Sequence, residues 1–247
     1  MGSLLYGHYW KIGFRSRLYD LLSPEAYRRS LQACVEALPP LKPGDRLLDA
    51  GCGPGLLLPW LKPLLVSGVS YVGTDLLETG LQAARQKARE LGLASRTAFL
   101  RADLSKAGSF MPGAFRAVIA HFSVYTLAAR AVRLQAWRNL NDFLNPDGVL
   151  VAANPATGYD ARGIIRDSLD QLQKQGRRKS YWAARLVGYP LAYALGLRFI
   201  QKQLERGVWH AYTLEDFRGE LAGAGFRVEW ERPVYGGSGW LVRARRG

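Results

Sequence analysis

A strand-like apolar run in this chain of 247 residues ends in a glycine-rich turn that could hold a ligand. From Asp49 to Gly55 the turn reads DAGCGPG. Glycine is needed where the backbone bends sharply, or where a ligand must approach without meeting a side chain. Two further acids, Asp75 and Asp103, each follow another strand-like run. Because the carboxyl ends of parallel strands meet at one edge of a sheet, this pattern predicts a ligand site with three carboxylates.

Two common nucleotide-binding motifs do not fit this turn. The dinucleotide fingerprint Gly-x-Gly-x-x-Gly needs a small residue at its sixth position, which is Leu56 counted from Gly51 and Leu58 counted from Gly53. A P-loop needs Gly-Lys-Ser or Gly-Lys-Thr, and neither follows the turn. The pattern that remains, Asp-x-Gly-x-Gly-x-Gly, resembles class I S-adenosylmethionine-dependent methyltransferases of the small-molecule or lipid type.

The resemblance implies S-adenosyl-L-methionine as cofactor and a role for each residue of the pattern. Asp49, Gly51 and Gly53 match the positions that hold the methionine part of the cofactor. Asp75 matches the acid that accepts hydrogen bonds from both ribose hydroxyls, a task suited to a carboxylate because both of its oxygens only accept.

The adenine end of the cofactor is assigned by the same resemblance. Asp103 matches the acid that accepts from the adenine amino group, and the backbone amide of Leu104 is expected beside the ring. No metal is implied, since the three histidines, His8, His121 and His210, do not have ligand spacing.

Residues after the fourth strand-like run are candidates for the reacting side of the site. His121 is the first candidate for a general base, and the alternative is that it only contacts cofactor or backbone. His210 is the second candidate base, with a surface or capping role as its alternative. Phe122 and Tyr125 are expected to wall the sulfonium by cation-π contact, unless they are ordinary core residues.

The residues after the fourth and fifth strand-like runs disfavour two classes of methyl acceptor. Enzymes that methylate amide or base nitrogens often carry Asn or Asp-Pro-Pro-Tyr or Phe after the fourth strand, where this chain has His121 and Phe122. Neither Cys34 nor Cys52 follows the fourth or fifth run, which argues against cysteine-dependent methylation of a pyrimidine carbon.

Strands and helices that alternate from about residue 45 must position these residues. Apolar runs predict strands, and segments with apolar residues at helical spacing predict helices over 77–91, 128–143 and 213–223. This alternation is typical of an α/β fold. The resemblance adds that the sheet is Rossmann-like and seven-stranded, mostly parallel with an antiparallel last strand, and flanked by helices. The strands are expected at 46–50, 69–74, 97–101, 115–120, 149–153, 226–231 and 239–245.

Residues 159–208 interrupt the alternation and are expected to form a helical cap inserted into a core of residues 41–158 and 209–247. Between Tyr181 and Ile200, apolar and aromatic residues take 15 of 20 positions, and a basic cluster precedes them. This combination favours a lid over a lipid-like substrate or contact with an anionic membrane surface, with packing against the sheet or a second subunit as the alternative. Trp182 and Tyr189 are predicted substrate contacts.

Residues 1–40 are predicted to form an N-terminal helical segment. Its Tyr19-Asp20 pair resembles one found in family members that act on quinone precursors and phospholipid head groups. Tyr19 is therefore a further predicted substrate contact.

The formal net charge of +14 is concentrated in one part of the chain. Between Arg162 and Arg206 there are ten basic and three acidic residues, which supplies half of that charge. An RNA methyltransferase that uses this basic face is the alternative function, and it predicts basic residues along a groove toward His121. A binding module without activity would lack cofactor affinity, which the three intact acids argue against.

Residues 1–11 lack the pattern of a signal peptide, so we expect a folded cytoplasmic protein, with association at the inner face of the membrane as a further possibility. The chain is 48% hydrophobic and has no run of about 18 purely apolar residues. The leading function is therefore methyl transfer to oxygen or nitrogen of a small hydrophobic or lipid-like molecule. The oligomeric state is left open.

Overall fold

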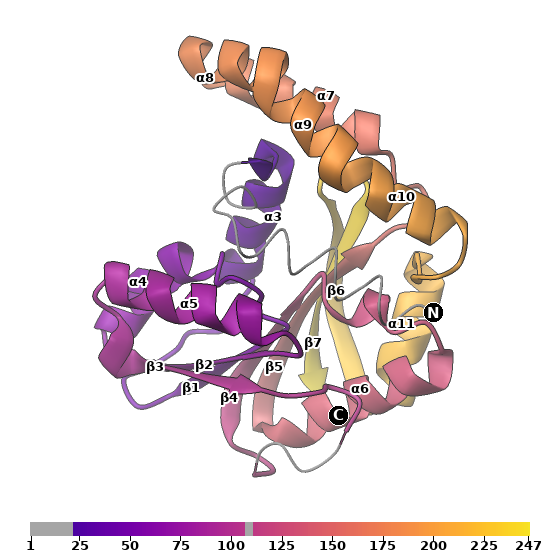
Figure 1. Cartoon of the computed structure of the whole chain (residues 1–247). Helices are drawn as coiled ribbons and strands as arrows, with labels where there is room; N and C mark the ends of the chain where they lie inside the picture. The colour runs from indigo at the N-terminus through magenta and orange to yellow at the C-terminus, as the bar shows by residue number, and fades with distance from the viewer. Residues whose placement is uncertain (1–21, 107–110) are drawn as a thin grey trace.

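The computed structural model describes residues 22–106 and 111–247, and within them the centre of the molecule is a seven-stranded sheet (Figure 1). Tyr19 lies outside the described residues. The strands are β1 (Arg46–Ala50), β2 (Ser70–Asp75), β3 (Thr97–Arg101), β4 (Phe115–His121), β5 (Leu144–Pro155), β6 (Phe226–Val234) and β7 (Gly239–Arg246).

The strand order is β3-β2-β1-β4-β5-β7-β6. Neighbouring strands from β3 to β5 pair in parallel, and β7 pairs antiparallel with both β5 and β6. The expected Rossmann-like α/β fold is therefore confirmed. The chain builds the sheet outward from β1 to β3 and then returns to place β4 on the other side of β1. Ligands of open α/β sheets bind at the carboxyl end of such a switch point.

Helices cover both faces of the sheet. They are α3 (Glu25–Glu36), α4 (Leu58–Val66), α5 (Glu78–Glu90), α6 (Arg130–Phe143), α7 (Ala161–Lys174), α8 (Arg178–Ala183), α9 (Tyr189–Ala192), α10 (Arg198–Glu205) and α11 (Leu214–Gly223). Short 3-10 helices are η1 (Ala94–Arg96) and η2 (Val124–Thr126), and π-helical turns are η3 (Ala184–Gly188) and η4 (Tyr193–Leu197).

Alternate residues of the strands feed two cores. Leu48 and Val118 pack with α6 and α11 on one face, whereas Leu47 and Ile119 pack with α3 and α4 on the other. This division follows from the two-residue period of a strand, which sends successive side chains to opposite faces.

Two local features differ in how well the sequence predicted them. Thr213 caps α11, and its hydroxyl accepts a hydrogen bond from the Asp216 N–H at 3.0 Å, as expected for a helix that begins there. In contrast, Asn145–Gly148, which lie between the predicted helix 128–143 and the predicted strand 149–153, are already part of β5. Leu144 already pairs with Phe115, and the register shifts before Val149 pairs with Ala117, so pairing with β4 continues across residues 145–148.

The segment between β5 and α11 is helical, as predicted. Helix α7 packs against α3, where the Ser168 hydroxyl accepts a hydrogen bond from the Ala26 N–H at 3.0 Å. Residues 178–205 then form one long helical rod, here called the arm, whose α8 end projects past the rest of the molecule in Figure 1. Pro190 in its middle lacks an N–H, and the π-helical turn at Ala184–Gly188 directly precedes α9, the helix that contains this proline. Among the described residues, no helix is both long and apolar enough to cross a membrane.

Candidate active site

A cavity of about 440 Å³ lies at the carboxyl ends of β1 to β4, at the switch point of the sheet. This volume is within the range of small-molecule sites. Among the described residues, its lining comprises Tyr27, Leu31, Asp49, Gly51, Cys52, Gly53, Pro54, Leu56, Leu57, Asp75, Leu76, Ala102, Asp103, Leu104, His121, Phe122, Ser123, Thr126, Leu127, Ala128, Ala129, Val132, Val208 and Trp209. The cavity thus contains every residue to which the sequence assigned a cofactor role.

The glycine turn forms the floor of this cavity. The N–H groups of Gly51 and Cys52 both donate to the Thr74 carbonyl at 2.8 Å, which ties the turn to the end of β2. Gly51 has φ of 88°, and a Cβ added there would lie 2.3 Å from the Cβ of Ser123. Only glycine fits this position. Ser123 also lines the cavity, and its buried hydroxyl has no hydrogen-bond partner among the described residues, so it is available to a ligand.

Asp49 is buried beneath the turn. The Tyr71 hydroxyl donates to its carboxylate at 2.7 Å. Burial raises the pKa of Asp49 to about 7, with a smaller contribution from Asp75 in the same direction, while the Tyr71 hydrogen bond opposes the shift. A carboxyl that titrates near neutral pH gains from a cationic partner, which fits the ammonium of the methionine part of S-adenosylmethionine.

Asp75 and Asp103 present carboxylates from the ends of β2 and β3. Asp75 accepts from the N–H of Gly53 at 3.0 Å and from that of Leu77 at 2.8 Å, so its two oxygens are held in place by backbone. Asp103 accepts from both the N–H and the hydroxyl of Ser105, at 3.0 and 2.7 Å. A carboxylate has about four acceptor sites, so each can still accept hydrogen bonds from a ligand.

His121 stands at the end of β4 and faces the same cavity. Its Nε2 lies 2.9 Å from the Ser30 hydroxyl on α3, and that hydroxyl donates its one proton to the Tyr27 carbonyl at 2.7 Å. Ser30 must therefore accept from His121, which makes Nε2 the protonated nitrogen and leaves the lone pair on Nδ1. Burial lowers the pKa of His121 to about 3, so the imidazole is neutral at physiological pH.

An aromatic wall adjoins His121. Phe122 has φ of 48°, a left-handed conformation that costs energy for a residue with a Cβ and that clusters at functional sites. Its ring stacks with Tyr27 at 6.0 Å and contacts Tyr235 at 5.2 Å. Gly239 permits this placement, because a Cβ there would lie 3.0 Å from the Phe122 ring. The expectation that Phe122 walls the site agrees with this position.

Four predicted site residues lie outside the cavity lining. Tyr125 is a core residue that packs on Trp209 at 5.5 Å, so the wall is Trp209 and not Tyr125. His210 contacts the Tyr212 ring at 4.4 Å, and its backbone N–H donates to the Tyr125 carbonyl. The predicted roles of Tyr125 as wall and of His210 as base are therefore not supported, because the 3-10 turn Val124–Thr126 buries Tyr125 and His210 packs against Tyr212, outside the described lining.

The two substrate contacts predicted on the arm, Trp182 and Tyr189, do not line the cavity. Trp182 is 55% exposed near the projecting end, and Tyr189 is buried with its hydroxyl accepting from the Glu25 N–H at 3.1 Å. Among the described residues, no part of 161–205 lines the cavity. In this structure the expected lid over the site is therefore not formed by the described residues of the arm. Only Val208 and Trp209, just after the arm, reach the cavity.

Sequence reasoning missed several lining residues. Tyr27 and Leu31 lie in the predicted helical segment 1–40 but were not assigned to the site, and they reach the cavity because α3 packs against β4 and β5. Trp209 and Ser123 carried no motif of their own. The one local signal for them was their place next to His210 and Phe122, which were singled out.

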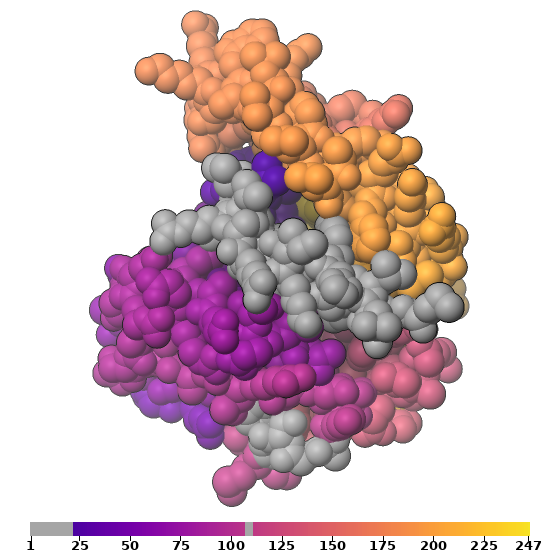
Figure 2. All heavy atoms as spheres, viewed as in Figure 1, coloured from indigo at the N-terminus to yellow at the C-terminus, as the bar shows by residue number. Residues whose placement is uncertain are grey.

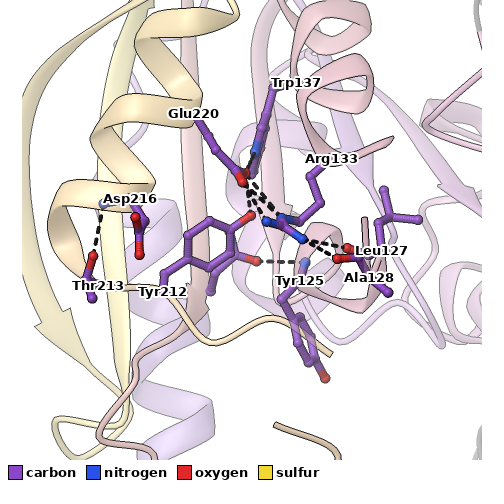
Figure 3. Close-up of polar contacts among 10 residues, drawn as sticks. Tyr125, Leu127, Ala128, Arg133, Trp137, Tyr212, Thr213, Asp216 and Glu220 are labelled. Atoms are coloured by element: carbon purple, nitrogen blue, oxygen red, sulfur yellow. Dashed lines mark hydrogen bonds and ion pairs between the residues drawn. The ribbon is translucent and has the colours of Figure 1, made fainter. Parts of the chain in front are cut away.

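A buried ionic network holds the outer wall of the cavity (Figure 3). Arg133 on α6 donates to Glu220 on α11 at 2.7 Å, and both side chains are almost fully buried. Arg133 also donates to the carbonyls of Leu127 and Ala128, at 3.1 and 2.7 Å, and both of these residues line the cavity. The Tyr212 hydroxyl donates to the same Glu220 carboxylate at 2.8 Å. The network therefore connects the wall after β4 to the helices behind it.

The fold is that of solved S-adenosylmethionine-dependent methyltransferases, and the cavity can be compared with what S-adenosylmethionine needs. Its residues fit that group: Gly51 leaves a cradle that a Cβ would fill, the Ser123 hydroxyl is buried without a partner, and three carboxylates face the cavity. Residues 47–148 match the family model described as a methyltransferase domain.

The chain is also similar to individual methyltransferases. Over 144 residues the chain is 30% identical to a nocamycin O-methyltransferase of Saccharothrix syringae, covering 56% of this chain but only 47% of that protein, so it spans about half of that relative's length. A methyltransferase structure from Aquifex aeolicus is similar with a TM-score of 0.61 at 18% identity, over 94% of this chain and 98% of that one. The geranyl diphosphate C-methyltransferase of Streptomyces coelicolor, solved with S-adenosylhomocysteine, gives 0.62 at 14% identity, over 89% and 76%.

Proposed function

We propose that this protein transfers a methyl group from S-adenosylmethionine to oxygen or nitrogen of a small hydrophobic acceptor, with a hydroxyl as the first choice. The observation that carries the proposal is the cavity lining. Most of the described lining residues are apolar or aromatic, with the hydroxyls of Ser123 and Thr126 among them, and the only charged ones are the acids Asp49, Asp75 and Asp103. Such a site suits a neutral, apolar acceptor. The similarity to an O-methyltransferase favours oxygen.

The chain contributes position and desolvation to this reaction. When bound, the cofactor supplies a methyl group on a sulfonium, which is already reactive toward a well-placed nucleophile. Phe122 and Trp209 would orient the acceptor and exclude water, and proximity of this kind can provide much of the rate enhancement. His121 would accept a hydrogen bond from the acceptor hydroxyl at Nδ1, because Nε2 is committed to Ser30.

The RNA alternative has less support. It predicts basic side chains along a groove toward His121, and no Lys or Arg is among the described residues that line the cavity. The arm has five Lys or Arg against one Glu, and no described residue of the arm lines the cavity. A polyanion would also meet three carboxylates at this edge of the sheet, which is electrostatically unfavourable.

A label-transfer assay tests the proposal. The protein is incubated with methyl-labelled cofactor and separate acceptors: phenols, hydroxylated quinones, apolar amines and RNA. We expect label in the small apolar acceptors. His121→Ala should lower turnover roughly a hundredfold while keeping cofactor affinity, whereas His210→Ala, outside the described cavity lining, serves as the matched control with little change. Transfer to RNA alone, or full turnover by the His121 variant, would contradict the proposal.

A further inference from the structure

The arm carries an apolar stripe on its outer side. The stripe consists of Trp182, Leu186, Val187, Leu191 and Leu195, whose exposed fractions run from 43% at Leu191 to 68% at Leu186. None of these five belongs to the buried hydrophobic clusters of the described residues. Isolated exposed leucines are ordinary, but five on one rod form a continuous apolar surface.

The stripe is separate from the face that fixes the arm to the body. Tyr189, Ala192 and Leu197 are buried on the inner side. Leu197 packs in a cluster with Ile164 of α7. Stripe residues recur every four or five positions, which is more than the roughly 3.6 residues of an α-helical turn. The π-helical turns at Ala184–Gly188 and Tyr193–Leu197 have more residues per turn, and this keeps the stripe on one side of the arm. The outer face is therefore built as a surface and is not unused core.

Every charge in the sequence that carries the stripe is basic. From residue 171 to 204 the chain has no Asp or Glu, whereas it has seven Lys or Arg. Arg178, Lys179, Arg185 and Arg198 are exposed beside the stripe. The guanidinium of Arg185 lies over the Trp182 ring at 5.8 Å. An apolar face bordered only by cations complements the head groups and acyl boundary of an anionic bilayer.

We propose that the arm is an interfacial anchor, which lies on the surface of an anionic lipid bilayer with the stripe inserted at the level of the head groups. In Figures 1 and 2 the α8 end of the arm projects beyond the body of the molecule, so a flat membrane surface can reach this end. A second copy of this chain is a poorer occupant, because pairing two stripes would bring their basic borders together. The anchor is independent of methyl transfer and goes beyond the proposed function.

Vesicle flotation tests the anchor without any assay of activity. The full chain is mixed with vesicles of phosphatidylcholine alone, or with about a third of phosphatidylglycerol. We expect the anionic vesicles to recruit the protein, and high salt to weaken this. Leu186→Ser with Leu191→Ser and Leu195→Ser should lower the bound fraction roughly tenfold or more. The pair Arg178→Ser and Lys179→Ser should lower it roughly fivefold per charge.

Control variants test whether any loss of vesicle binding is specific to the arm. Val66→Ser and Met111→Ser alter exposed apolar residues away from the arm and should leave flotation unchanged. Circular dichroism checks that each variant is folded, as expected for exposed positions. Equal recruitment of the wild type and the triple leucine variant would overturn the proposal. So would a dimer, seen by light scattering, that the triple variant dissociates while neither protein binds vesicles.

Discussion

At the scale of single residues, burial sets the protonation of the site. It raises the pKa of Asp49 to about 7, also raises that of Asp75, and lowers that of His121 to about 3. Each shift favours the neutral form, as expected where charged groups lose water. The site is thus prepared to gain from a cationic ligand beside Asp49, and His121 stays neutral across the physiological range.

The Asp49 shift predicts how cofactor affinity depends on pH. Below about pH 7 the carboxyl is protonated in the free protein and must lose its proton to pair with the cofactor ammonium. Affinity should therefore rise with pH up to about 7 and then level off, which calorimetry across this range would measure. Asp49→Asn should bind more weakly and lose this slope. An unchanged slope in the variant would assign it to another group.

The contribution of Asp49 to the stability of the free protein should depend on pH in the opposite direction, falling as the pH rises. The folded-state pKa of Asp49 lies above the usual value of 3.8, so between 3.8 and about 7 the folded state holds more protons than the unfolded state. The contribution of this group to stability is fully present below that range and is lost as the pH rises through it.

The sequence predicted the polar residues of the site better than its apolar wall. Asp49, Asp75 and Asp103 could be placed because each ends a strand, and the ends of parallel strands coincide at one edge. Tyr27 and Trp209 could not, since they reach the cavity through packing of segments far away in the chain. Proximity to a motif was a poor guide, because the turn after β4 buries Tyr125 in the core.

At the scale of elements, the pair of Arg133 and Glu220 joins α6 to α11 and supports the cavity wall. Removing one partner of a buried pair leaves the other as an uncompensated charge. We expect Glu220→Ala to lower the free energy of unfolding by about 3–5 kcal/mol, measured by urea denaturation. As a control, Glu36→Ala breaks the half-exposed ion pair between Glu36 and Arg232, and it should change the free energy of unfolding by less than about 1 kcal/mol. Equal losses in the two variants would show that the buried pair has no special role.

At the same scale, six of the seven strands were predicted to within a few residues, whereas β5 begins five residues early and the arm departs from its expected helical period. Apolar spacing along the arm placed Trp182, Leu186, Tyr189 and Leu197 on one face. The structure divides them, since Tyr189 and Leu197 are buried whereas Trp182 and Leu186 are exposed. The two π-helical turns shift the phase of the helix, and a constant period of 3.6 residues cannot represent that shift.

At the scale of the whole molecule, charge and shape separate two surfaces. Three acids, Asp49, Asp75 and Asp103, line the cavity at the carboxyl edge of the sheet, and half of the net charge of +14 lies between Arg162 and Arg206. The projecting arm is part of that basic segment and contributes no described residue to the cavity. Cofactor binding and any association with a surface can therefore be altered one at a time by substitution.

The most direct test of the account is a calorimetric titration of the full chain with S-adenosylmethionine, compared with Asp75→Ala. Both carboxylate oxygens of Asp75 are fixed by backbone N–H groups at the cavity edge, so the variant loses a prepared acceptor for the ribose hydroxyls. We expect one cofactor per chain, with binding weakened by about 1.5–3 kcal/mol in the variant. Unchanged affinity in a folded Asp75→Ala protein, or no binding to the wild type, would contradict the account.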